Sequence, residues 1–139
     1  MTPSSATNTA WWLAILLTAA WYLPFTIGAQ HVGFEADDAL YLMMADWFAS
    51  GWRNDPVLLY VQSVSHLPPL YSIVLALAGA GSNQLDIAHL VQTFFTLGAI
   101  LLHARLCAAI SGKTSHGLLL LAILAAMPAT LLMATEIWS

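Results

Sequence analysis

A stretch of 20 residues without a charge, residues 10–29, constrains the fold of this chain more than any other feature. At a rise of about 1.5 Å per residue, a helix of this length matches the roughly 30 Å hydrocarbon core of a bilayer. A cleaved secretory signal would start with a basic segment, but residues 1–10 contain neither lysine nor arginine. We therefore expect a retained transmembrane helix at residues 10–29.

The rest of the chain has the same apolar character. Apolar residues make up 60% of the 139 residues and charged residues 7%, which is typical of a membrane protein and not of a soluble domain. A second apolar run, residues 87–110, carries Arg105 near its end, where a long side chain can reach the interface. A third run covers residues 117–137. We expect an all-α, polytopic membrane protein: one membrane domain over residues 1–139 with about three transmembrane helices.

The charged residues and the single cysteine exclude several kinds of partner and site. The fixed cations are Arg53, Arg105 and Lys113, against seven acids, so the chain has no basic patch for a nucleic-acid backbone. Cys107 alone forms neither an internal disulfide nor a cysteine metal site. We expect no nucleic-acid partner, and we expect the chain to be surrounded by the lipid bilayer.

The distribution of charge predicts the orientation in the membrane. Arg105 and Lys113 lie at the tight turn near residues 111–116, which the positive-inside rule assigns to the cytoplasm. With residues 1–9 also cytoplasmic, the acidic loop at residues 30–86 is extracytoplasmic, provided that no further crossing interrupts it.

Two segments of this outer loop are expected to be surface helices. Near residues 37–52, apolar side chains recur at spacings of three and four, which is typical of an amphipathic helix lying along a membrane surface. The apolar stretch at residues 67–81 begins with two prolines and is short for a crossing. We expect it at the outer interface, although its sequence alone leaves a crossing open.

Asp37 and Asp38 stand at the start of the first surface helix. Carboxylates at this position can accept hydrogen bonds from free backbone amides and interact favourably with the helix dipole. They can also take a proton from an acceptor or, at Asp37, hold a divalent cation. Both interpretations are open, and they are compatible with each other. Asp46, one turn too far along the helix, is expected only to be solvated.

Three other polar residues are candidates for a site on the same side. Glu136 follows the third apolar run, where a carboxylate needs water, a metal or a partner, so it either faces Asp37 and Asp38 or is simply solvated. His66 could bind a metal through a neutral imidazole. Arg53 could bind a phosphate through its planar guanidinium group, or pair with a nearby acid.

Three motifs in this order resemble the N-terminal part of GT-C fold glycosyltransferases. They are "EADDALY" at residues 35–41, "LPPLY" at 67–71 and "PATLLMATEIWS" at 128–139. The similarity is strongest to the bacterial aminoarabinose-transferase-like and protein O-mannosyltransferase-like enzymes, and it extends over nearly the whole chain. It implies a partial GT-C module, because members of that family are several times longer.

The resemblance also implies an activity and roles for residues. Such enzymes transfer a sugar from a polyprenyl-phosphate donor to a lipid, glycan or protein acceptor at the periplasmic face of the bacterial inner membrane. It implies catalytic roles for Asp37, Asp38 and Glu136. It also implies that Tyr41 and Tyr71, which belong to two of the motifs, contact the substrate. Arg53 is expected to contact it through its guanidinium group.

Three further expectations concern a cofactor, the length of the protein and an alternative function. A divalent metal ion is a candidate cofactor, with Asp37 and His66 as its candidate ligands. We expect an N-terminal fragment that is inactive alone. The alternative is a small non-enzymatic membrane subunit, whose surface helix docks onto a partner and whose acids only cap and solvate.

Overall fold

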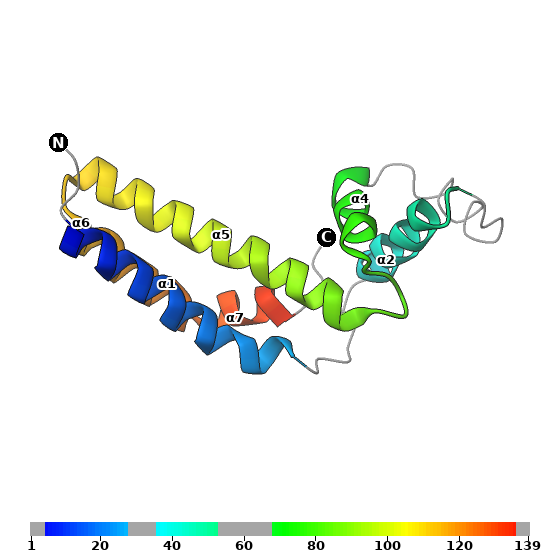
Figure 1. Ribbon diagram of the computed structural model, residues 1–139, viewed down its shortest axis with the longest axis horizontal. Helices are drawn as coiled ribbons and strands as arrows, with labels where there is room; N and C mark the ends of the chain where they lie inside the picture. Colours follow the sequence, from blue (N-terminus) through cyan, green and yellow to red (C-terminus); the bar gives the residue numbers. More distant parts are fainter. Residues whose placement is uncertain (1–4, 28–35, 53–67, 136–139) are drawn as a thin grey trace.

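The computed structural model describes residues 5–27, 36–52 and 68–135 (Figure 1). These residues form helices and short turns, without a strand among them, so the all-α prediction is confirmed. The helices are α1 (Ser5–Thr26), α2 (Ala36–Ala49), α4 (Pro69–Ala78), α5 (Leu85–Ser111), α6 (Thr114–Ala126) and α7 (Pro128–Thr135).

Helices α1 and α5 are long and apolar enough to cross a membrane. Their 22 and 27 residues correspond to lengths of about 33 and 40 Å. In each, only 22% of the most apolar segment is buried inside the protein, whereas a core helix of a soluble protein would be mostly buried. Trp12 is 66% exposed and Phe94 is 75% exposed. The outward faces of both helices are therefore suited to lipid.

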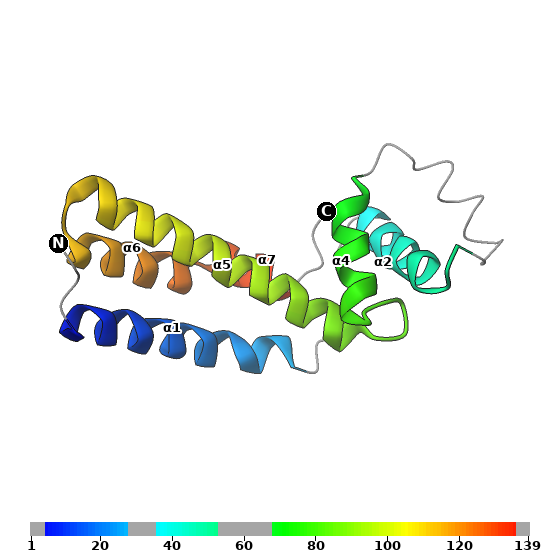
Figure 2. The ribbon, with the colours of Figure 1, turned by 45° about the horizontal axis from the view of Figure 1, so that its top comes forward.

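Helices α1, α5 and α6 lie side by side along the long axis of the molecule (Figures 1 and 2). Trp11, Tyr22, Ile100 and Leu121 belong to the buried cluster between them. The turn between α5 and α6 is short because Gly112 adopts a left-handed conformation, with φ of 68°. The two helices therefore form a tight antiparallel hairpin.

The third predicted span is two helices and not one. Helix α6 has 13 residues and α7 has 8, and Met127 between them is extended, with ψ of 128°. Pro128 is the cause, because it has no backbone N–H and its ring clashes with the carbonyl of Leu124 four residues earlier. Helix α1 contacts the chain next to this break, because the Tyr22 hydroxyl donates a hydrogen bond to the Ala125 carbonyl oxygen at 3.4 Å. Residues 117–135 thus do not form one continuous helix, and α6 alone is shorter than a typical span.

Helices α2 and α4 pack against each other at the end of the molecule where α5 begins (Figure 2). Helix α2 starts one residue before the predicted position and ends three residues earlier than predicted, before a turn in which Gly51 and Trp52 have φ of 69° and 70°. Helix α4 begins at Pro69, where a missing N–H costs nothing, and ends before Gly79, with φ of 78°. With 10 residues it measures about 15 Å, half of a hydrocarbon core.

Asp46 connects these two helices to α5, which corrects the expectation that it is merely solvated. Its Oδ2 atom accepts hydrogen bonds from the backbone N–H of Ser82, at 3.1 Å, and from the Ser82 hydroxyl. Gly81 packs so close that an added Cβ would overlap the Asp46 Oδ1 atom. The carboxylate therefore holds the turn between α4 and α5 against α2.

The two ends of the helical bundle carry different segments. The start of α1 and the turn between α5 and α6 lie at one end, while α2, α4 and the start of α5 lie at the other (Figures 1 and 2). The predicted orientation needs this arrangement, because residues 111–116 and the N-terminal segment must share one side. Which end faces the cytoplasm stays a prediction.

Candidate functional site

A groove of about 520 Å³ lies where α2, α4 and α5 meet. Its lining is mainly apolar and aromatic, with a few polar groups; it consists of Tyr41, Pro68, Leu70, Tyr71, Val74, Gln92 and Phe95. Ligand sites commonly combine an apolar lining with a small number of placed polar groups. This groove is therefore suited to hold a substrate.

Tyr41 and Tyr71 come together in this groove, although they belong to different helices. Their rings lie edge to face with centroids 5.5 Å apart. The Tyr71 hydroxyl donates a hydrogen bond to Gln92 Oε1 at 2.9 Å, and Ser72 Oγ donates to the Tyr41 carbonyl oxygen at 3.0 Å. Tyr41 is 4% exposed, and Tyr71 is half-buried. Both residues that the LPPLY and EADDALY motifs nominate for substrate contact thus line one groove.

Gln92 and Phe95 are groove residues that the sequence reasoning missed. The ring of Phe95 lies 6.3 Å from that of Tyr71, so α5 supplies the third aromatic side chain of the groove. A signal existed for Gln92, because it is the one amide side chain in the apolar run at residues 87–110. A polar side chain inside a span usually faces protein or a cavity, as Gln92 does.

Asp37 and Asp38 are the second and third residues of α2 and so lie in its first turn. This is the position at which the sequence placed them. Residue 37 stands one helical turn before Tyr41 and therefore shares its face of the helix.

The remaining predicted site residues, Arg53, His66 and Glu136, lie outside the described residues. Helix α7, which ends just before Glu136, lies on the α2 side of α6 in both views (Figures 1 and 2). No group of three or more His, Cys, Asp or Glu able to hold a metal is found within residues 5–27, 36–52 and 68–135. A metal held by Asp37 and His66 stays a prediction.

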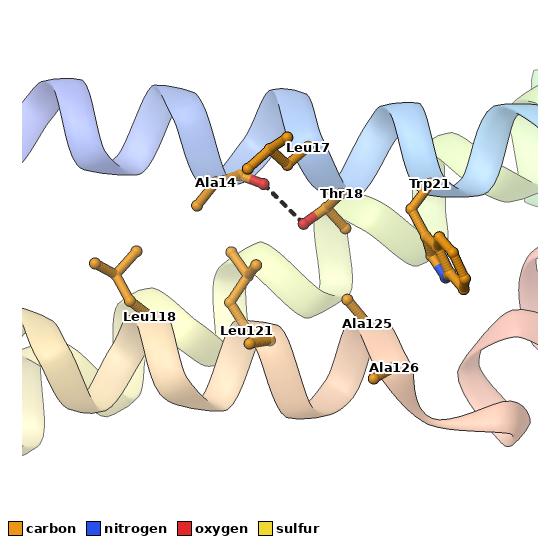
Figure 3. A pocket seen from close by; sticks show the side chains of 9 residues that line it. Ala14, Leu17, Thr18, Trp21, Leu118, Leu121, Ala125 and Ala126 are labelled. Carbon is orange, nitrogen blue, oxygen red and sulfur yellow. Dashed lines mark hydrogen bonds between the residues drawn. The ribbon is translucent and has the colours of Figure 1, made fainter.

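A second hollow, between α1 and α6, has a different chemical character. This crevice of about 290 Å³ is lined mostly by alanine and leucine, and Trp21 stands at its far end (Figure 3). Its one hydroxyl, that of Thr18, donates to the Ala14 carbonyl oxygen of its own helix at 2.8 Å. The crevice offers an apolar surface and no group suited to catalysis.

Comparison of the chain with protein-family models, with curated proteins and with solved structures found no match. The resemblance to GT-C glycosyltransferases therefore rests on the motifs and their order along the chain.

Proposed function

We propose that this chain is the N-terminal membrane region of a GT-C glycosyltransferase. The enzyme transfers a sugar from a polyprenyl-phosphate donor to a lipid, glycan or protein acceptor at the extracytoplasmic face of a bacterial inner membrane. The observation that supports this best is the groove in which Tyr41 and Tyr71 meet, with Asp37 one turn before Tyr41 on the same helix.

The character of the groove suits a donor that is part sugar and part isoprenoid. The hydrogen-bonded pair of Tyr71 and Gln92 places polar atoms among the rings of Tyr41 and Phe95 and the aliphatic side chain of Leu70. Such a lining can hold an apolar chain while a few polar groups orient the head of the ligand. Helices α1 and α5, with their exposed apolar faces, support an integral membrane location.

Sugar transfer from a lipid phosphate has two chemical requirements. The acceptor hydroxyl must lose its proton as its oxygen attacks the anomeric carbon, and the departing phosphate must be stabilised as it takes the electron pair of the broken C–O bond. In the proposed mechanism Asp37 accepts the proton, while Asp38 and Glu136 orient the base and the acceptor. Arg53 is the candidate in this chain for stabilising the charge of the phosphate. A divalent cation, when bound, would supply further positive charge.

The test uses the intact protein that contains this chain, reconstituted into vesicles with a labelled polyprenyl-phosphate sugar and its acceptor. We expect Asp37→Asn to lower kcat for transfer about 10²- to 10⁴-fold, as is usual for loss of a general base. Asp86→Asn is the matched control, because Asp86 is also an acid in the first turn of a helix, α5, at the same end of the molecule.

The outcomes separate the proposal from its rival. Normal transfer by folded Asp37→Asn protein would refute the role of Asp37 as base. If the unaltered intact protein transfers no sugar above protein-free vesicles, the non-enzymatic membrane subunit is the better description. Equal losses in the Asp37 and Asp86 variants would show that the acids act only through helix stability.

A further inference from the structure

The cations of the described chain gather at the end of the bundle opposite to the groove. Arg105 lies near the end of α5, and Lys113 lies in the turn that follows it. The acids within the described ranges belong to α2 and to the start of α5, at the other end (Figure 1). No carboxylate pairs with Arg105 or Lys113 anywhere in those ranges. This end therefore has a positive charge that the described residues do not neutralise.

Arg105 is held in place by an aromatic ring. Its guanidinium carbon lies 4.2 Å from the ring centroid of Trp11, which is only 3% exposed. Trp11 packs in turn against α6, where a Cβ added to Gly117 would lie 3.1 Å from the indole Cη2 atom. Stacking uses the flat face of the guanidinium group and leaves the N–H donors in its plane available for an anion.

The apolar crevice between α1 and α6 begins directly beyond this stack. Ala14 is one turn after Trp11 on α1, and Leu118 follows Gly117 on α6 (Figure 3). From Leu118 the crevice continues to Ala126, which is about 12 Å of helix. A narrow apolar slot thus runs parallel to the helices, away from an end whose two cations pair with no carboxylate in the described part of the chain.

We propose that one anionic phospholipid binds at this end, with its phosphate against Arg105 and Lys113 and one acyl chain in the crevice between α1 and α6. The positive charge favours an anionic lipid over a zwitterionic one, because each cation near the surface contributes its own attraction. The start of α6, immediately after Lys113, adds the positive end of a helix dipole. The site is independent of the proposed transferase activity, which belongs to the opposite end.

The experiment measures lipids retained on the intact protein by native mass spectrometry, after equilibration in micelles with equal amounts of phosphatidylglycerol and phosphatidylcholine. We expect phosphatidylglycerol to be retained preferentially. Arg105→Gln and Lys113→Gln should each lower its retention roughly fivefold, the equivalent of about 1 kcal/mol per cation. Lys113 is exposed in a turn, so its variant provides a test even if the Arg105 variant fails to fold.

The chain site is tested separately from the charge. Ala122→Phe fills the crevice without changing a charge and should lower phosphatidylglycerol retention, whereas Ala99→Phe, on an exposed part of α5 away from the crevice and from both cations, should not. Glycerophosphoglycerol, which has the headgroup without acyl chains, should not compete at equal concentration.

Three results would overturn the proposal. Equal retention of the two lipids would show that the charge of the lipid does not determine binding. Unchanged retention in both Lys113→Gln and Arg105→Gln would show that these cations do not bind the phosphate. Unchanged retention in Ala122→Phe would mean that something else covers the crevice, such as another part of the chain or a second copy.

Discussion

Gly117 is the position where a single added methyl group tests how α6 packs against α5. A Cβ there would lie 2.5 Å from the Ala104 carbonyl oxygen and 2.7 Å from the Ala108 Cβ. Ordinary contacts of a carbon with a carbonyl oxygen are about 3.3 to 3.6 Å, so the two helices must separate by roughly 1 Å. Overpacking of this kind costs about 1 to 3 kcal/mol, and the better helix propensity of alanine returns at most about 1 kcal/mol. We expect Gly117→Ala to lower the free energy of unfolding by about 1 to 2 kcal/mol.

Gly98→Ala is the matched control for this prediction. Gly98 lies inside α5, is exposed, and has no neighbouring atom within 4 Å of an added Cβ. Its substitution therefore changes helix propensity without a clash, and it should leave stability unchanged or raise it by up to about 1 kcal/mol. The assay is unfolding by sodium dodecyl sulfate in mixed micelles, followed by far-UV circular dichroism. If Gly117→Ala were as stable as Gly98→Ala, the close packing of α5 and α6 would be refuted.

Two further predictions concern the junction of α1 with α5 and the orientation of the chain. The buried hydroxyls of Thr26 and Thr93 are 2.8 Å apart. A double-mutant cycle with valine at both positions should give a coupling energy of about 0.6 to 1.7 kcal/mol in the same unfolding assay. Zero coupling would contradict the hydrogen bond. In a Cys107→Ala background, cysteines at the exposed positions Asn83 and Ser115 should react with an impermeant maleimide from opposite faces of sealed vesicles. Labelling from one common face would contradict the predicted orientation.

The long helices could be predicted from sequence because length and apolar composition alone define them. The run at residues 87–110 lies within α5. The described part of the run at residues 10–29 lies in α1 and in the turn residue that follows it. Within residues 117–135 the apolar run forms two helices, because average hydropathy does not register what Pro128 does to the backbone. That this segment crosses the membrane stays a prediction. Pro24, by contrast with Pro128, stands inside α1 without ending it, so a proline in an apolar run does not by itself mark the end of a helix.

The candidate site was predictable only where it depends on local structure. The start of α2 places Asp37 and Asp38 in a first turn, and helix-start chemistry is readable from neighbouring residues. The contact of Tyr41 with Tyr71 depends on how α2 packs on α4, and the Gln92 hydrogen bond depends on how α4 meets α5. Packing between helices is not encoded in any one segment, so periodicity could not reveal it.

The contact of Asp46 with Gly81 has a consequence for the evolution of the protein. Because the Asp46 carboxylate occupies the space of a side chain at position 81, a larger residue there would require that carboxylate to move or position 46 to become smaller. Loss of the carboxylate would in turn leave the Ser82 amide without its acceptor. We expect positions 46, 81 and 82 to vary together among homologous sequences, as residues in direct contact do.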